Sequence, residues 1–156
     1  MKLTRAFVAL AAVLALSGCV QGGVSPVDPP DDPIEASPTA WADGLIEASR
    51  QSDTAPSEFA EREVLPSCGD VELSQGEIIP ESAINCMNEA FDTGAELAVV
   101  MPTDEGDPVV AFYRVVPSIR GMDLVTDSRL DSFGLGLGWT IEHCVDTVDV
   151  REPAGC

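Results

Sequence analysis

The chain opens with an apolar run that separates a leader from everything that can fold. Two basic residues precede the run Ala6–Leu16, and the small residues Ser17 and Gly18 come directly after it. About a dozen apolar residues are too few to cross a bilayer core, which needs about 20. A basic start, a short apolar stretch and small residues at the cut are typical of a secretory signal. We therefore expect residues 1–18 to be removed and the fold to be built from residue 19 onward.

The end of the leader carries a more specific pattern. Leu16-Ser17-Gly18-Cys19 resembles the lipobox of bacterial lipoproteins. The resemblance implies that Cys19 receives a diacylglyceryl group, becomes the N-terminus after cleavage and is acylated further, as with palmitate. Two or more acyl chains give a stable membrane anchor, whereas one gives only marginal binding. The expected location is the extracytoplasmic face of the cell membrane; a plain signal peptide with an incidental cysteine is the alternative.

The mature chain is strongly acidic. Removing residues 1–18 removes two of the eight basic residues and none of the 27 acidic ones, which leaves a net charge of −21 over 138 residues. All six remaining basic residues are arginines. Such a field repels nucleic-acid phosphates, so nucleic-acid binding is excluded as a function. It also repels anionic headgroups, so the membrane contact must be the lipid. Solubility explains the acidity, with a specific cationic partner as the alternative.

Four cysteines remain after the leader, and an even count in an exported chain predicts disulfides. Three connectivities are possible. We favour Cys68–Cys86 and Cys144–Cys156, because each pair is close in sequence and brackets one structural unit. Zinc is the rival, but paired C-x₂-C spacings are missing from the sequence and His143 is its only histidine.

Composition divides the mature chain into three parts. Residues 19–38 are rich in Gly, Pro, Asp and Ser, which predicts a disordered tether with a reach of roughly 60 Å. The pattern of residues 39–64 predicts short helices. The first is expected over 40–50, with Trp41, Leu45 and Ala48 on one apolar stripe. The compact domain is expected over residues 65–156.

Within that domain the pattern predicts one helix and then a series of strands. Ile79–Phe91 has Pro80 in its first turn, Gly94 after its end and an apolar face that includes Ile84 and Met87. Apolar and β-branched runs predict strands near 71–73 and over Ala95–Met101, Val109–Val116, Met122–Thr126 and Trp139–Cys144. The predicted fold class is α+β, with one helix packed on a four- to five-stranded antiparallel sheet.

Two motifs add a family resemblance. Thr103–Val109 reads TDEGDPV, and Asp127–Gly134 reads DSRLDSFG. Together they resemble a family of small Gram-positive lipoproteins of unknown function, over roughly Leu97 to Cys144. The resemblance implies the lipoprotein class and the sheet, and it carries no activity or site residue.

Acidic side chains in the same two motifs are the candidate metal site. Five carboxylates on two loops suit the oxygen-rich coordination of Ca²⁺, although their spacing does not match an EF-hand. Asp and Gly also serve turns directly, and Arg129 could pair with its neighbours. The candidate ligands are Asp104, Glu105, Asp107, Asp127 and Asp131. No other cofactor is predicted.

The glycine-rich segment 134–138 leads into a strand, so we interpret it as a hairpin loop and not as a phosphate-binding loop. Its Leu135 and Leu137, with Trp139, are candidate contacts for a protein partner. His143 shares strand parity with Trp139, which predicts a core-facing or edge position. No catalytic residue is predicted, because the sequence has one histidine and no cysteine is expected to be free for a nucleophile–histidine pair.

The sequence therefore predicts a lipid-anchored extracytoplasmic protein that is not an enzyme. Its expected role is a binding or interaction module whose partner is a protein or an envelope component. A calcium-binding structural or sensing domain is the first alternative, and a small hydrolase is the second.

Overall fold

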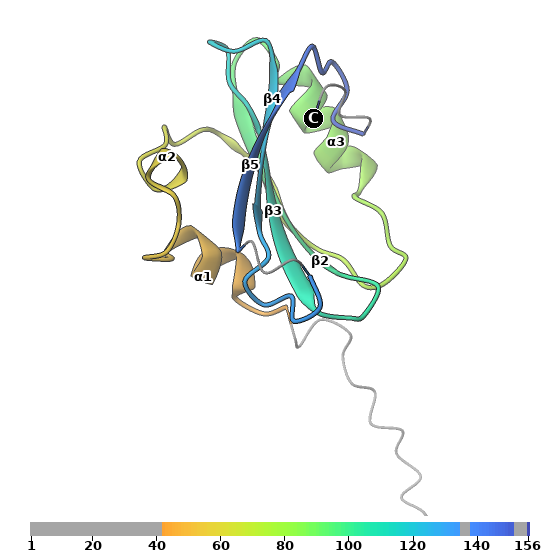
Figure 1. The fold of residues 1–156 in the computed structure, drawn as a ribbon. Helices are drawn as coiled ribbons and strands as arrows, with labels where there is room; N and C mark the ends of the chain where they lie inside the picture. Colours follow the sequence, from red (N-terminus) through yellow and green to blue (C-terminus); the bar gives the residue numbers. More distant parts are fainter. Residues whose placement is uncertain (1–41, 135–137, 152–155) are drawn as a thin grey trace, which may run out of the picture. The chain divides into compact units, whose positions relative to one another are not determined.

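The computed structural model describes residues 42–134, 138–151 and 156, which form a five-stranded sheet with helices on both faces (Figure 1). The strands lie in the sheet in the order in which they occur along the chain. They are β1 (Ser67–Glu72), β2 (Ala95–Pro102), β3 (Pro108–Val115), β4 (Gly121–Asp127) and β5 (Trp139–Val145). The helices are α1 (Leu45–Arg50), α2 (Ser57–Ala60) and α3 (Glu81–Glu89). The leader, Cys19 and the predicted tether lie outside the described residues.

The α+β class is confirmed, but the expectation of a purely antiparallel sheet is wrong. β2 to β5 pair antiparallel, whereas β1 runs parallel to β2. The segment between β1 and β2 contains α3, which returns the chain to the end of the sheet where β1 began. A helical crossover of this kind joins parallel neighbours, because a tight hairpin cannot.

α3 covers one face of the sheet. Pro80 stands at its N-cap and Glu81 lies in its first turn, where a negative charge is favourable. Ile84 and Met87 are buried in an apolar cluster that includes Leu97 and Val99 of β2. The predicted apolar face of this helix is therefore confirmed.

α1 and α2 cover the opposite face, so the expectation of one helix on the sheet is incomplete (Figure 1). Phe59 of α2 is buried, with its ring centre 4.7 Å from that of Phe112 and 5.2 Å from that of Trp139. α1 begins only after Gly44, whose φ of 77° interrupts the helix expected from residue 40. Its buried side chains are Ile46 and Ser49. Of the predicted stripe, Leu45 packs partly buried against the same cluster, Ala48 is exposed, and Trp41 lies outside the described residues.

Two disulfides tie these layers together, in the connectivity predicted from the sequence. Cys68 of β1 is bonded to Cys86 of α3 across the parallel crossover. Cys144, buried near the end of β5, is bonded to Cys156. The crossover helix and the C-terminal residue are therefore both covalently fixed to the sheet.

Candidate functional site

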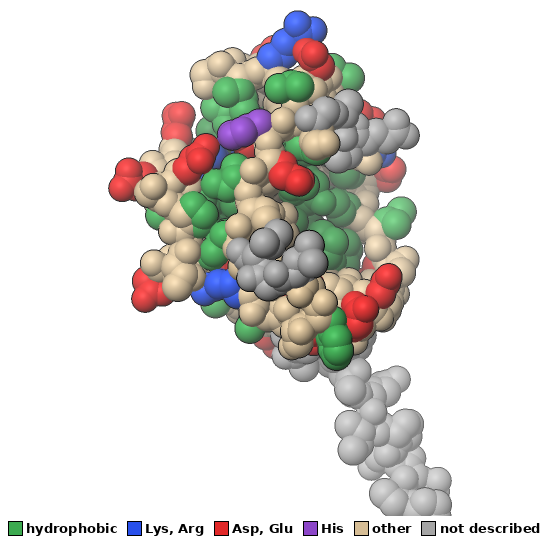
Figure 2. Space-filling model, in the orientation of Figure 1, with side chains coloured by type: hydrophobic (Ala, Val, Ile, Leu, Met, Phe, Trp, Pro, Cys, Tyr) green, Lys and Arg blue, Asp and Glu red, His purple; other side chains and the backbone are tan. Residues whose placement is uncertain are grey.

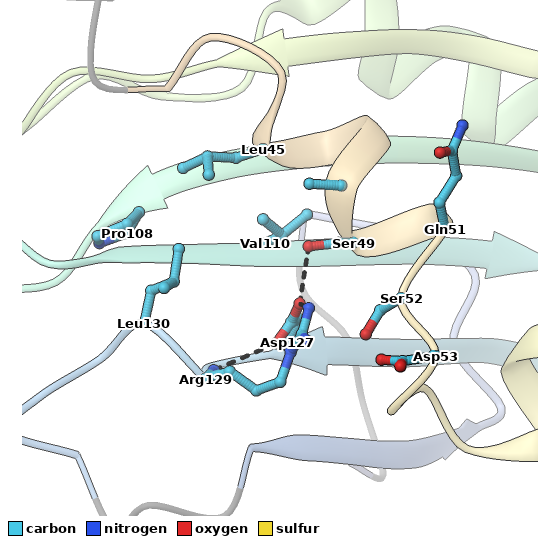
Figure 3. Close-up of a pocket in the computed structure, with 11 residues that line it drawn as sticks. Leu45, Ser49, Gln51, Ser52, Asp53, Pro108, Val110, Asp127, Arg129 and Leu130 are labelled. Atoms are coloured by element: carbon cyan, nitrogen blue, oxygen red, sulfur yellow. Dashed lines mark hydrogen bonds and ion pairs between the residues drawn. The ribbon is translucent and has the colours of Figure 1, made fainter.

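A buried carboxylate marks the first polar site, which we call the Asp127 pocket. Asp127 is the last residue of β4 and is only 6% exposed. The Ser49 hydroxyl on α1 donates to its Oδ2 at 2.7 Å, and Arg129 donates Nε to Oδ1 at 2.8 Å and Nη2 to Oδ2 at 2.7 Å. Figure 3 shows these contacts beneath a pocket of about 570 Å³ between α1 and the ends of β3 and β4. Helix and sheet are joined here through a single carboxylate.

Electrostatics keep that carboxylate ionised. Burial acts to raise the pKa of Asp127, but the hydrogen bonds from Arg129 and Ser49 outweigh it, so the pKa lies below its usual value. The same contact raises the pKa of Arg129, against a smaller opposing effect of burial. Both Asp127 oxygens already accept hydrogen bonds. A group in this state suits a structural ion pair better than proton transfer.

A second polar site, the Glu96 cluster, consists of Glu96 of β2 with Arg50, Arg62 and Arg114. Glu96 Oε2 accepts from Arg62 Nε at 2.9 Å and from Arg114 Nε at 3.0 Å. Arg50 Nε lies 3.8 Å from Oε1, and its guanidinium also forms two hydrogen bonds with Asp70 of β1. The Arg62 guanidinium stacks 3.6 Å from the ring centre of Phe59. The cluster thus fixes α1, α2 and the segment after α2 to the sheet.

The main apolar opening lies on the other face and is called here the α3-side groove. Its volume is about 460 Å³, within the range of about 300–1,000 Å³ typical of binding sites. Figure 2 shows hydrophobic side chains recessed in a hollow to the right of the sheet, bordered by the chain that leads into α3. The apolar lining is Leu73, Ile78, Ile79, Ile84, Met101, Tyr113, Leu124 and Val150, and the charged lining is Glu77, Glu81 and Arg151.

The five candidate metal ligands do not converge on one point. Asp107 accepts from the Ser132 backbone N–H at 2.7 Å, which places the two acidic loops side by side. Asp131 accepts from the N–H groups of Phe133 and Gly134, and Asp127 is held by Arg129. Asp104 and Glu105 are exposed in the β2–β3 turn. Among the described residues, no group of three or more His, Cys, Asp or Glu side chains is arranged to hold a metal ion.

The candidate partner contacts are only partly covered by the structure. Leu135 and Leu137 lie outside the described residues. Trp139 is half-buried, packs on Phe59 and has the Arg129 guanidinium 5.4 Å from its ring centre. His143 is 60% exposed on the α2 side of edge strand β5, with Nδ1 2.8 Å from Asp123 Oδ1 and Nε2 3.7 Å from Glu58 Oε1. Of the two predicted positions, the structure shows the edge position.

Sequence reasoning missed the Glu96 cluster and the α3-side groove. A signal for the cluster was present, because Glu96 and Arg114 are single opposite charges inside apolar strands. Two such residues avoid the cost of burial only by pairing. The groove had no comparable signal, since its lining comes from six separate segments.

Comparisons with protein-family models, with curated proteins and with solved structures return no match to this chain. The resemblance to small Gram-positive lipoproteins therefore stays a prediction. In the part of the chain that the structure describes, none of the helices has the length and hydrophobicity of a transmembrane span.

Proposed function

We propose that this protein is a lipid-anchored binding module of the cell envelope. Cys19 carries the anchor, and the domain that begins near Ala42 binds a protein partner on the extracytoplasmic side. The observation that supports binding most directly is the α3-side groove, an open, mostly apolar groove with a volume of about 460 Å³ on a very acidic protein. Exposed apolar surface of this kind is typical of interaction sites.

The polar sites support binding over chemistry. The carboxylates of Asp127 and Glu96 are both occupied by arginine guanidinium groups, which fixes helices to the sheet. The floor of the groove instead consists of apolar side chains and one phenol, that of Tyr113, whose pKa is raised by burial, and its charged residues lie among the lining at Glu77, Glu81 and Arg151. A mostly apolar lining suits contact with a partner side chain.

In-cell photo-crosslinking tests the binding function. A photoreactive amino acid is placed at position 78, in the groove lining, and for comparison at position 64 on a different pocket. Ile78 and Val64 are 82% and 93% exposed, so neither replacement disturbs the core. We expect a discrete protein adduct from position 78 and none from position 64. Equal labelling at both positions, or none at position 78, would contradict a groove-specific partner.

Replacement of the anchoring residue tests the location separately. We expect a Cys19→Ser chain to leave the membrane fraction for the soluble extracytoplasmic fraction, because a lone secretory leader supplies no acyl chain. A Cys68→Ser/Cys86→Ser chain is the matched control, since it also loses cysteines but keeps the lipobox. If the Cys19→Ser product stayed with the membrane, lipid anchoring would be refuted while the groove experiment retained its meaning.

A further inference from the structure

The floor of the α3-side groove is a part of the sheet that α3 leaves open. α3 contacts β1 and β2, whereas the groove lies over Met101, Tyr113 and Leu124, on β2, β3 and β4. Tyr113 and Leu124 are directly paired across β3 and β4, so their side chains share this face. The floor is therefore a strip of apolar side chains beside the helix.

The lip of the groove presents an aliphatic side chain to water. Ile78 is 82% exposed, although the neighbouring Leu73 and Ile84 are 8% and 3% exposed. An isoleucine in this position gains free energy when a partner covers it, because apolar area is then removed from water. The occupant must accordingly bring apolar side chains of its own.

Acidic groups surround this apolar strip. Glu77 is exposed, the Glu81 side chain is 71% exposed, and Glu142 on β5 faces the same side as its cross-strand partner Leu124. The one cation in the lining, Arg151, already pairs with Glu81 and with Asp149. The mouth of the groove therefore has a negative potential, which favours a positively charged occupant.

The other arginines of the mature chain are also ion-paired with carboxylates. The mature chain has six arginines and no lysine, and all six arginines lie in the described part of the chain. Each is ion-paired with a carboxylate within 4.0 Å: Arg50, Arg62, Arg114, Arg120, Arg129 and Arg151. An anionic ligand, such as a fatty acid or a phospholipid headgroup, would meet acidic side chains at the groove without an uncommitted cation to bind it.

Charge also argues against two occupants supplied by the protein itself. A second copy would bring another 21 negative charges to an already acidic surface. The predicted tether, residues 19–38, contains Asp28, Asp31, Asp32 and Glu35 and no basic residue. Like charges brought together in this way disfavour association.

We infer that the α3-side groove binds a cationic amphipathic segment of a partner protein, with apolar side chains on the strip and lysine or arginine at the acidic rim. This inference rests on the proposed binding function and specifies the chemistry of the partner. The arrangement is that of an amphipathic helix in an apolar groove. Electrostatic attraction brings the segment to the rim, and apolar burial retains it.

A defined peptide tests the inference on the mature chain, residues 19–156 with Cys19 replaced by serine. The probe is a synthetic peptide of leucine and lysine with all leucines on one helical face. Controls are a peptide of the same composition with dispersed leucines, a leucine–glutamate peptide with the original spacing, and dodecanoate. Calorimetry gives the affinities, and amide NMR shifts at Ile78, Tyr113 and Leu124 report the site. We expect only the first peptide to bind in the groove.

Two matched pairs of variants separate groove binding from general attraction to an acidic protein. Ile78→Ser should weaken binding about tenfold, because an exposed isoleucine becomes buried in the complex, whereas Val64→Ser should leave the affinity unchanged. Glu77→Gln should weaken binding and reduce its salt dependence, and the exposed Glu61→Gln should do so much less.

Several results would overturn the inference. Equal affinity for the dispersed-leucine peptide, or equal losses with Ile78→Ser and Val64→Ser, would show attraction to charge alone. Groove binding by dodecanoate or by the leucine–glutamate peptide would refute a cationic partner but leave the proposed binding module intact. Absence of binding to any probe would also refute the inference, and the crosslinking experiment at position 78 would then decide the proposed function on its own.

Discussion

Replacing Glu96 by glutamine would remove one negative charge from between three arginines while keeping the size of the side chain. Glu96 and Arg114 have side chains that are only 11% and 8% exposed, and Arg62 is 14% exposed. In the variant, Arg50 keeps its ion pair with Asp70, whereas Arg62 and Arg114 lose Glu96, the one carboxylate with which each is paired among the described residues. Two arginines would then lie partly buried without a counter-charge.

The size of the effect depends on this burial. Removing one partner of a buried ion pair costs about 3–5 kcal/mol, because the other charge stays buried and unpaired. Arg62 and Arg114 would still donate to the carbonyl oxygens of Phe59 and Glu63, which offsets part of the loss. We therefore expect Glu96→Gln to lower the free energy of unfolding by about 2–4 kcal/mol, a large share of the about 5–15 kcal/mol typical of a domain.

Urea denaturation monitored by tryptophan fluorescence measures this difference. The matched control is Asp70→Asn, which removes a 48% exposed carboxylate from the same network. An exposed pair is worth about 0.2–1 kcal/mol and is weakened by salt, so this control should cost little and less still in high salt. If Glu96→Gln cost no more than Asp70→Asn, or lost its effect in high salt, the Glu96 cluster would not be a buried structural network.

Three further predictions concern other parts of the fold. The hydrogen bond to Asp123 and the charges of Asp123 and Glu58, against a small effect of burial, raise the pKa of His143 above its usual 6.5. A raised folded-state pKa stabilises the fold fully below the unfolded pKa and loses that effect as pH rises through the folded one. His143→Gln should therefore cost a few tenths of a kcal/mol in mildly acidic buffer and nothing in mildly alkaline buffer, as urea denaturation at both pH values will show. Gly121→Ala should lower the free energy of unfolding by about 2–4 kcal/mol more than Gly76→Ala, measured by the same method. Both glycines have positive φ, but only at Gly121 would a Cβ meet a backbone oxygen, at 2.1 Å. Equal losses in the two variants would refute this close approach. Millimolar calcium should not raise the melting temperature beyond the effect of sodium chloride at equal ionic strength. The reason is that three of the five candidate carboxylates already accept hydrogen bonds. A rise specific to calcium would establish the metal site.

Local patterns in the sequence predicted much of the fold. Ile84 and Met87 recur at helical spacing, and β-branched runs mark β2 and β3, so these elements needed no tertiary information. The disulfide pairing was predictable from proximity in sequence. The start of β1 was missed because its sequence, SCGDVE, has little alternation, and its direction was predicted wrongly as antiparallel. A helix between two strands was nevertheless sufficient reason to expect a parallel pair.

The candidate sites depended on contacts between distant segments, which sequence patterns do not encode. Ser49 bonds Asp127 across 78 positions, and nothing in its neighbourhood distinguishes it from other serines. The acidic residues of the two loops were predicted to be one set of metal ligands because carboxylates are the ligands that Ca²⁺ prefers. In the folded chain, however, Asp127 lies beneath α1 with Arg129, and the carboxylates of Asp107 and Asp131 cap backbone N–H groups.

The Cys68–Cys86 disulfide affects the risk that newly made chains aggregate. β1 is the outer neighbour of β2, whose stretch Leu97–Val100 is fully buried, uncharged and rich in β-formers. If a reduced chain released β1, this stretch would become a bare sheet edge, and such edges recruit strands from other molecules. Closing the bond keeps β1 close to that edge, so newly made protein is open to aggregation until oxidation joins the two cysteines and is protected afterwards.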